Sequence, residues 1–170
     1  MYKFQRAAVA TADELVDLWV KTFEQAYEGV HSPENIHAYC SRNFTNQAAL
    51  KVLNDDWSAC CIASKKGQAV GYYVVSHHPC PVPLEGLSSE LKQLYILSSE
   101  YGTGLGKSLF GQACETARNA GSTWLWLCVS DINYRAQAFY KKQDFKPVGK
   151  GPVFEVGTDR LSSTVMVCSL

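Results

Sequence analysis

Apolar residues in the first third of the chain recur mainly at intervals of three and four. Leu15, Trp19 and Phe23 follow this spacing, which is typical of the buried face of an amphipathic helix. A short strand precedes this helix, and two further helices follow it. The pattern predicts a strand at 3–9 and helices at about 12–27, 32–43 and 47–53.

Polar residues that can cap helices mark the start of two of these segments. Thr11 is followed three residues later by Glu14, which is the spacing of a capping box. Ser32 precedes Pro33, and a proline at the first helical position costs no intrahelical hydrogen bond. We therefore expect Thr11 and Ser32 to be N-caps.

From residue 57 onward the pattern changes to short runs rich in β-branched and aromatic residues. The first two runs are joined by a segment containing Gly67, which adopts positive φ easily, so they should form a hairpin. Residues 77–90 hold three of the six prolines and are expected to be a loop. The predicted strands are 57–64, 69–76, 91–97, 124–129, 146–156 and 161–169. One further helix is predicted to start in the segment 102–106 and to end at about residue 120, and another to run from residue 133 to about 143.

This order of elements predicts an α/β fold with one mixed sheet and helices on both of its faces. Residues 124–129 are apolar on both sides, as expected for a central strand that helices cover. No repeat or linker divides the chain, and its length suits one buried core. We therefore expect a single domain over residues 1–170.

The composition argues against several classes of partner. The 16 basic and 16 acidic residues leave no net charge to attract nucleic acid or an anionic membrane. No apolar stretch has the length of a membrane helix, and the first residues do not resemble a signal peptide. We expect a cytoplasmic protein without a nucleic-acid partner, a membrane partner or a metal site, and seven reduced, packed thiols: Cys40, Cys60, Cys61, Cys80, Cys114, Cys128 and Cys168.

A glycine-rich turn between a predicted strand and a predicted helix is the first candidate for chemistry. The first amides of a helix lack internal partners and carry the positive end of its dipole, and glycine lets a phosphate approach them. Lys107 and Ser108 follow the turn and can add a charge and a hydroxyl. The turn consists of Gly102, Thr103, Gly104, Leu105 and Gly106.

Two familiar phosphate motifs do not fit this turn. A nucleotide P-loop, GxxxxGK[ST], requires glycine at the position of Tyr101. In the dinucleotide motif GxGxxG, the third glycine would fall one residue after Gly106. Two interpretations of the glycine turn therefore stay open. It is either a tight turn that binds no ligand or a binding site for the diphosphate of coenzyme A.

A second block separates these alternatives. After the apolar strand the chain reads N-x-x-A-x-x-F-Y-x-x-x-x-F, from Asn133 to Phe145. Together with Leu94-Tyr95-Ile96-Leu97 and the glycine turn, this block resembles the two cofactor blocks of the GNAT superfamily of N-acetyltransferases. The order, separation and secondary structure of the blocks match over residues 90–146.

The resemblance implies a GNAT fold, a strongly twisted mixed sheet of about seven strands with a splay between strands 4 and 5. It also implies acetyl-CoA as cosubstrate, bound in that splay. The pantetheine arm would pair with the backbone of Leu94, Tyr95 and Ile96, near Asn133 and Ala136. The diphosphate would lie on the amides of Gly102, Thr103, Gly104, Leu105, Gly106 and Lys107.

The chain departs from the family pattern at two positions. Tyr101 stands where the family usually has Arg or Gln supporting the phosphate, so affinity should depend on Lys107 and the backbone. Asp144 stands where the family often has glycine, which concerns a turn rather than the chemistry.

Acetyl transfer from a thioester to an amine requires a deprotonated amine, a polarised carbonyl and a proton for the leaving thiolate. The amide of Ile96 can polarise the carbonyl. Tyr140 is the expected catalytic acid, because the family places a tyrosine beside the thioester sulfur and a tyrosine pKa exceeds that of a thiol. Packing with Phe139 and Phe145 is the alternative role for Tyr140.

The general base is not decided by the sequence. Several relatives, including polyamine acetyltransferases, use an acidic residue early in the fourth strand, where this chain has Lys92 and Gln93. The remaining candidates are a water chain to solvent or one of four side chains: Glu24, Glu28, His77 and His78.

The acceptor amine is equally open. Phe-x-x-x-Tyr followed by Ser-Pro-Glu resembles the N-terminal part of bacterial spermidine/spermine-type acetyltransferases and favours a small amine or polyamine over a protein N-terminus or lysine. A non-catalytic acyl-CoA-binding module is the chief rival, a nucleotide phosphotransferase is another, and the resemblance also implies a homodimer. The acceptor site should be lined by the loop at 77–90 and by Trp19, Phe23, Tyr27 and Tyr39.

Overall fold

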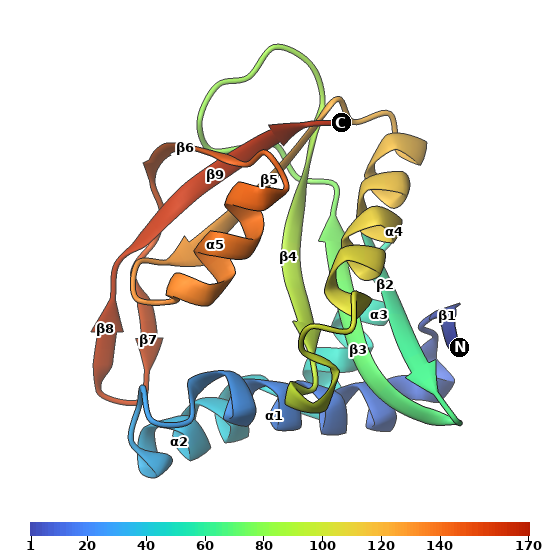
Figure 1. Ribbon diagram of the computed structural model, residues 1–170, viewed down its shortest axis with the longest axis vertical. Coiled ribbons are helices and arrows are strands. Elements are labelled where there is room, and N and C mark those ends of the chain that lie inside the picture. The colour runs from blue at the N-terminus through green and yellow to red at the C-terminus, as the bar shows by residue number, and fades with distance from the viewer.

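Seven strands form one mixed sheet in the order β1-β2-β3-β4-β5-β9-β6, and a separate hairpin, β7-β8, extends from it (Figure 1). The computed structural model describes residues 1–170. The strands are β1 (Tyr2–Arg6), β2 (Ser58–Lys65), β3 (Gln68–Ser76), β4 (Ser88–Ile96), β5 (Trp124–Ser130), β6 (Lys146–Lys150), β7 (Phe154–Val156), β8 (Asp159–Leu161) and β9 (Ser163–Ser169). The helices are α1 (Ala12–Tyr27), α2 (Pro33–Asn43), α3 (Asn46–Leu53), α4 (Leu105–Asn119) and α5 (Tyr134–Lys142), with 3-10 turns η1 (Val9–Thr11) and η2 (Ser98–Glu100).

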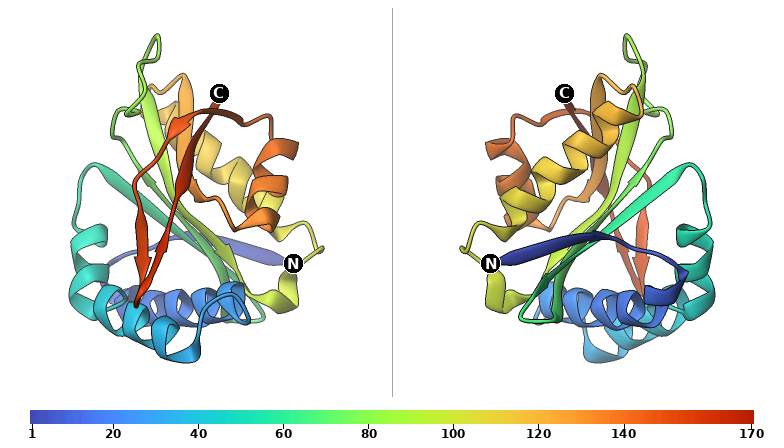
Figure 2. Two further views of the ribbon diagram at one scale, coloured as in Figure 1. Left: turned by 90° about the vertical axis from the view of Figure 1, so that its left-hand side faces the viewer. Right: turned by 90° about the vertical axis from the view of Figure 1, so that its right-hand side faces the viewer.

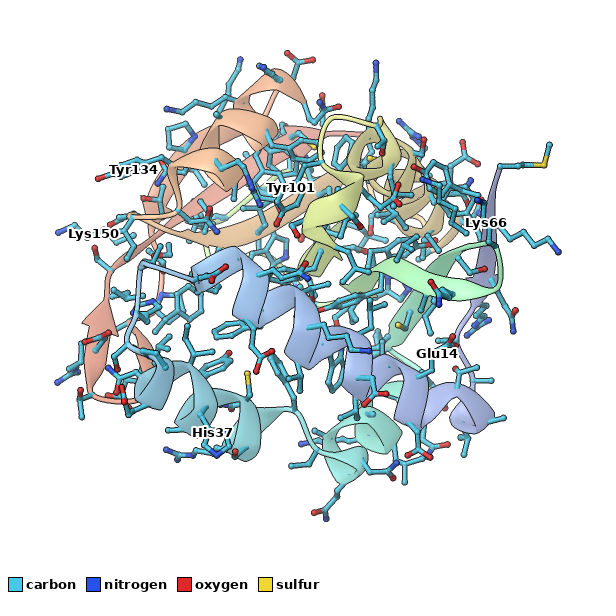
Figure 3. All side chains as sticks on the ribbon, turned by 60° about the horizontal axis from the view of Figure 1, so that its bottom comes forward. Glu14, His37, Lys66, Tyr101, Tyr134 and Lys150 are labelled. Atoms are coloured by element: carbon cyan, nitrogen blue, oxygen red, sulfur yellow. The ribbon has the colours of Figure 1, made fainter.

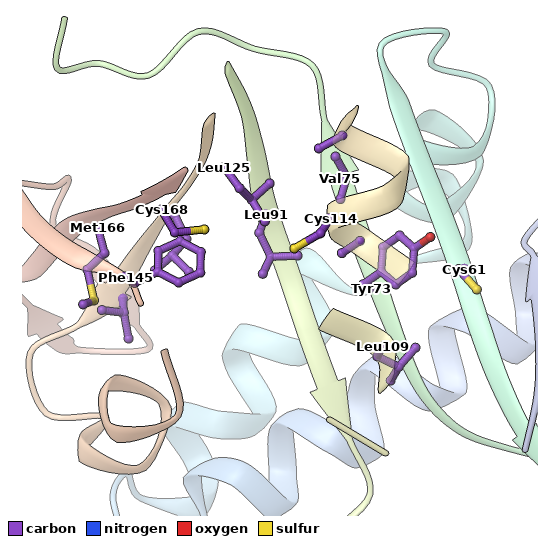
Figure 4. Close-up of a cluster of buried hydrophobic side chains, with 14 of the residues drawn as sticks. Cys61, Tyr73, Val75, Leu91, Leu109, Cys114, Leu125, Phe145, Met166 and Cys168 are labelled. Carbon is purple, nitrogen blue, oxygen red and sulfur yellow. The ribbon is translucent and has the colours of Figure 1, made fainter. Parts of the chain in front are cut away.

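Helices cover both faces of the sheet, as the sequence predicts (Figure 2). On one face α4 and α5 pack over a core to which Leu91 of β4 and Leu125 of β5 contribute (Figure 4). On the other face α1 and α3 pack over Tyr72 and Val74 of β3. These two faces are called the α4 face and the α1 face below.

The only parallel pair of the sheet, β4 with β5, is joined over a short distance. It comprises the pairs Ser88–Trp124, Ser89–Leu125 and Glu90–Trp126. Beyond Glu90 the two strands diverge towards α1 (Figure 1). The predicted splay between the fourth and fifth strands is therefore present.

A β-bulge lies where the splay begins. Val75 pairs with Leu91 while Val74 pairs with Gln93, so that Lys92 has no partner on β3. An extra residue bends a strand and increases its local twist. The bulge therefore turns β4 immediately after its last residue paired with β5.

Hydrogen bonds to β1, β2 and α1 hold the segment between β4 and α4 in place. Glu100 is buried and accepts hydrogen bonds from the Tyr2 hydroxyl and from Lys65 Nζ at 2.9 Å. Ser98 N–H donates to Gln25 Oε1 of α1 at 2.7 Å. These contacts fix the start of the glycine turn relative to β1, β2 and α1.

The predicted capping box at Thr11 is wrong. Thr11 precedes α1, but its hydroxyl donates to the carbonyl oxygen of Ala8 at 2.8 Å and makes no cap hydrogen bond to α1. The turn η1 offers this nearer partner. Ser32, in contrast, accepts from Asn35 N–H at 3.2 Å, so the second predicted cap is confirmed.

Two predicted boundaries are also wrong. The loop predicted over 77–90 is shorter, because β4 begins at Ser88. The strand predicted over 146–156 is divided into β6 and β7, with Pro152 in the interruption. Proline has no N–H for a ladder, and the carbonyl of Pro152 accepts from the Ser163 hydroxyl instead.

Candidate active site

The glycine turn adopts the conformation that its glycines permit. Gly102 has φ 76° and Gly104 has φ 88°, both in the left-handed region. A Cβ at either position would meet no atom within 4 Å, so the backbone angle rather than space explains the glycine. Gly104 is the N-cap residue from which α4 starts.

The first amides of α4 are available for a ligand. Ser108 N–H donates to Gly104 O at 3.1 Å, and Leu105 N–H has only a long contact of 3.4 Å to Thr103 Oγ1. The amides of Gly106 and Lys107 have no protein acceptor. These donors lie at the positive end of a 15-residue helix, which is the geometry that binds phosphate oxygens.

The backbone of β4 is open on the side of the splay. Tyr95 and Ile96 pair with Tyr72 and Gly71 of β3, and neither has a partner on β5. Leu97 N–H donates to Val70 O at 2.9 Å. Because successive amides of a strand point to opposite edges, the amide of Ile96 points into the splay. The structure thus supplies the free donor that the sequence led us to expect at Ile96.

Tyr140 lies where α5 approaches α1. Its ring is 5.4 Å from the rings of both Phe139 and Phe145, and it is half-buried against the α4-face core. Burial raises the Tyr140 pKa above its usual value, and the nearby Tyr27 of α1 raises it further. Tyr140 therefore has the packing role and also a protonated hydroxyl at neutral pH.

A hydrogen bond links the side chain of Asn133 to the backbone of Ala136. Asn133 is the N-cap of α5, and its Oδ1 accepts from Ala136 N–H at 3.1 Å. Only the amide nitrogen of the Asn133 side chain is left for another partner. Ala136 packs against the α4-face core.

Glu90 is the site residue that the sequence analysis missed. It stands early in β4 and forms the last pair with β5, at the point where the splay begins. An acidic residue is therefore present early in the fourth strand, two residues before Lys92 and three before Gln93, although the sequence led us to expect none there. The prediction of a loop through residue 90 hid it, although the Ser-Ser-Glu-Leu pattern fits a strand.

The surroundings of Glu90 perturb its acidity. Burial raises its pKa, and this effect outweighs the opposing charges of Lys92 and His78. The carboxylate is close enough to Cys128 of β5 to contribute, after burial, to a Cys128 pKa of about 11. Ser89 and Leu91 face the α4 core, so Glu90 and Cys128 face the α1 side of the sheet.

The four earlier candidates for the base lie elsewhere. Glu24 and Glu28 are exposed on α1, and His78 is exposed after β3. His77 Nδ1 contacts the Ser89 hydroxyl at 2.9 Å, which in turn contacts Ser122 at 2.7 Å. Burial lowers the pKa of His77. Glu24 and Glu28 lie far along the sequence from the start of the splay, and the two histidines follow β3 rather than standing on β4 or β5, although the charge of His78 acts on Glu90.

Aromatic residues line the α1 side of the splay. Phe23 stacks on Tyr39 with centroids 4.4 Å apart and contacts Tyr27 at 4.5 Å. Tyr95 of β4 stacks on Tyr72 and packs against the same cluster. Trp19 packs instead in the core over β3, where its ring centroid lies 6.4 Å from that of Tyr72.

Two segments cover this side of the sheet. The β7-β8 hairpin is joined to the α1–α2 region by the ion pair His31 Nδ1–Asp159 Oδ2 at 2.7 Å and by Asn35 Oδ1, which accepts from Thr158 N–H at 3.1 Å. The loop after β3 is held by Trp126, whose Nε1 donates to His78 O at 3.0 Å.

Residues 12–145 match the family model described as Acetyltransferase (GNAT) family. The chain belongs to this family. An uncharacterized N-acetyltransferase of Mycobacterium tuberculosis (strain ATCC 25618 / H37Rv) is 31% identical over 159 residues, covering 94% of this chain and 97% of the relative. An uncharacterized N-acetyltransferase of Archaeoglobus fulgidus is 28% identical over 139 residues, covering 81% and 90%.

Solved structures share the fold over the whole chain. The PaiA N-acetyltransferase from Thermoplasma acidophilum, solved in complex with coenzyme A, has a TM-score of 0.83 at 16% identity, covering 100% of this chain and 99% of that one. A ribosomal-protein-alanine N-acetyltransferase from Brucella melitensis has a TM-score of 0.65 at 25% identity, covering 99% of both chains.

The GNAT fold and the acetyl-CoA-dependent N-acetyltransferase activity implied by the two blocks are thereby confirmed. Acetyl-CoA is the cosubstrate and supplies the activated acetyl group. The free amides of the turn and the open edge of β4 suit its diphosphate and its arm. No helix is long and apolar enough to cross a membrane, and no group of three or more His, Cys, Asp or Glu side chains is arranged to hold a metal ion.

Replacing Gly104 tests the turn. Gly104→Ala places a side chain at φ 88°, which costs about 1–2 kcal/mol, and relaxation of the turn would misalign the free amides. We expect a lower Tm and a Kd for coenzyme A raised about tenfold in calorimetry. Gly111→Ala is the control, because Gly111 is helical with open space around it. Equal coenzyme A affinity in both variants would contradict the role of the turn.

Proposed function

We propose that this N-acetyltransferase acetylates a small primary amine, with Glu90 as general base and Tyr140 as general acid. The observation that carries the proposal is the end of β4–β5 pairing at Glu90, which puts a partly buried carboxylate at the start of the splay. The free amide of Ile96 and the hydroxyl of Tyr140 approach the same splay from β4 and α5.

The proposed cofactor site is built from two elements. Gly102, Gly104 and Gly106 leave the amides at the start of α4 open for a diphosphate, and Lys107 adds a positive charge. Leu94 and Ile96 offer backbone groups along the unpaired edge of β4. The remaining proposed contacts are Tyr95, Thr103, Leu105, Asn133, Ala136 and Tyr140.

Glu90 suits the task of removing a proton from the amine. An amine nucleophile must be neutral, and a carboxylate whose pKa is raised is a stronger base than an exposed one. Glu90 lies on the same face of the sheet as the aromatic cluster of Phe23, Tyr27 and Tyr95. The acceptor would therefore approach from the α1 face.

Tyr140 would act on the thioester. Ile96 follows Glu90 by six residues, about 20 Å along an extended strand, so its free amide would bind the pantetheine arm rather than the reacting carbonyl. The Tyr140 hydroxyl is protonated at neutral pH and has a proton to give to the leaving thiolate, whereas burial raises its pKa and so makes it a weaker acid.

A small acceptor is favoured because the α1 side is covered. The His31–Asp159 ion pair holds the β7-β8 hairpin in place, and the tryptophans of β5 hold the loop after β3. A folded protein would need both segments to move. The aromatic rings suit a cationic amine through cation–π contacts.

An amine screen tests the acceptor class. Thiol release from acetyl-CoA should be accelerated by small monoamines or by polyamines such as spermidine. The likeness to a ribosomal-protein-alanine N-acetyltransferase makes an alanine-initiated peptide the comparison substrate. Preference for the peptide would refute the small-amine proposal, and no acceleration by any amine would favour a non-catalytic acyl-CoA-binding module.

Substitution of Glu90 tests the base. Glu90→Gln should lower kcat/KM about 10²–10⁴-fold and leave the Kd for coenzyme A unchanged, since Gln cannot accept the proton. In the native enzyme the rate should fall as pH drops through the raised Glu90 pKa, and this acid limb should vanish in the variant. Glu85→Gln, on the exposed loop, is the control. A variant with native turnover and an unchanged pH profile would exclude Glu90.

Substitution of Tyr140 tests the acid. Tyr140→Phe keeps the ring contacts with Phe139 and Phe145 but removes the proton donor, so kcat should fall about 10²-fold or more with little change in coenzyme A affinity. Tyr134→Phe removes a hydroxyl from the same helix at a side chain that is 73% exposed, and it should have no effect. Unchanged turnover in Tyr140→Phe would leave Tyr140 with a packing role alone.

A further inference from the structure

Arg135 and Tyr101 connect the two cofactor blocks. The guanidinium carbon of Arg135, the second residue of α5, lies 3.6 Å from the ring centroid of Tyr101. Tyr101 is the residue before the glycine turn (Figure 3). A cation over an aromatic face at this distance is a favourable contact. The stack brings a positive charge from α5 to the start of the turn.

The charge of Arg135 is not neutralised by the protein. None of the three ion pairs in the structure involves Arg135. The neighbouring acid Glu100 is held by Lys65 and Tyr2, and Asp131 accepts from Ser162 and Thr164. Arg135 also lies in the first turn of α5, at the positive end of the helix dipole, where a cation is unfavourable.

Three positive features therefore meet at one side of the splay. They are the free amides at the start of α4, the exposed Lys107 and the guanidinium over Tyr101. Such an arrangement is electrostatically costly without an anion and favourable with one. A diphosphate is the anion that the proposed cofactor site would bring there.

We propose that Arg135 binds the diphosphate of coenzyme A and that Tyr101 is the residue that positions it. This inference rests on the proposed cofactor site. An Arg fork can donate two parallel hydrogen bonds to phosphate oxygens, which a lysine cannot do. The phosphate-supporting side chain that the family usually has at position 101, Arg or Gln, is thus supplied from the second block, across the splay.

Tyr101 contributes by restricting the guanidinium before the ligand arrives. A long flexible side chain loses rotamer freedom when it binds, and a side chain already held against a ring loses less. The ring, not the hydroxyl, makes this contact. Tyr101→Phe should therefore behave as the native protein, whereas Tyr101→Ala should weaken coenzyme A binding.

Binding measurements on the full chain test the proposal. Calorimetry with coenzyme A should give a Kd for Arg135→Ala that is about tenfold to a hundredfold higher, as expected for lost hydrogen bonds to a charged group. S-acetylpantetheine, which lacks phosphate, should bind the native protein and the variant equally. 3′-Dephospho-coenzyme A should show the same loss as coenzyme A.

Three further variants separate a ligand contact from a structural one. Arg135→Lys keeps the charge without the fork and should recover only part of the affinity. Arg135→Ala combined with Tyr101→Arg returns a cation to the turn and should recover more than Arg135→Ala alone. Arg118→Ala, at an exposed position in the last turn of α4, is the matched control and should bind coenzyme A normally.

Specific results would overturn the inference. Native coenzyme A affinity in Arg135→Ala, or an equal loss for S-acetylpantetheine, would show that Arg135 does not bind phosphate. Loss confined to coenzyme A and absent with 3′-dephospho-coenzyme A would move the contact to the ribose phosphate and refute the diphosphate assignment. Failure of the native protein to bind coenzyme A would refute the proposed cofactor site itself. This binding measurement can be made without knowing the acceptor amine.

Discussion

The end of hydrogen bonding between β4 and β5 is the constraint on which the site depends. Central strands of a sheet normally satisfy each other's backbone groups, and leaving such groups unpaired is costly. Here the pairing ends after Glu90 and Trp126, and a bulge at Lys92 bends β4. The open edge of β4 supplies donors and acceptors that a ligand can satisfy.

Charge is divided between the two faces of the splay. On the α4 face, helix N-termini, Lys107 and Arg135 create a positive region, because the nearby Glu100 is held by Lys65 and Tyr2. On the α1 face, Glu90 is partly buried and pairs with Trp126 of β5. An anionic cosubstrate and an amine acceptor would thus enter from opposite faces and meet where the strands separate.

Errors in the sequence analysis have local physical causes. Thr11 was expected to cap α1, but the carbonyl of Ala8 lies closer to its hydroxyl. Three prolines suggested a loop through residue 90, whereas β4 already begins at Ser88 because Ser88 and Ser89 pair with Trp124 and Leu125 of β5. That boundary error of a few residues removed Glu90 from consideration as the base.

The sequence by itself determined the elements, the glycine turn, the second block and therefore the GNAT family and its cosubstrate. These features depend on hydrophobic periodicity and on local backbone conformation, such as the positive φ at Gly102 and Gly104. Residues that are close together in the sequence specify both. Only the tertiary structure decided that Glu90 stands where the strands part and that Arg135 lies over Tyr101. Such contacts join residues far apart in the chain, and they are selected by the packing of the whole sheet rather than by any local pattern.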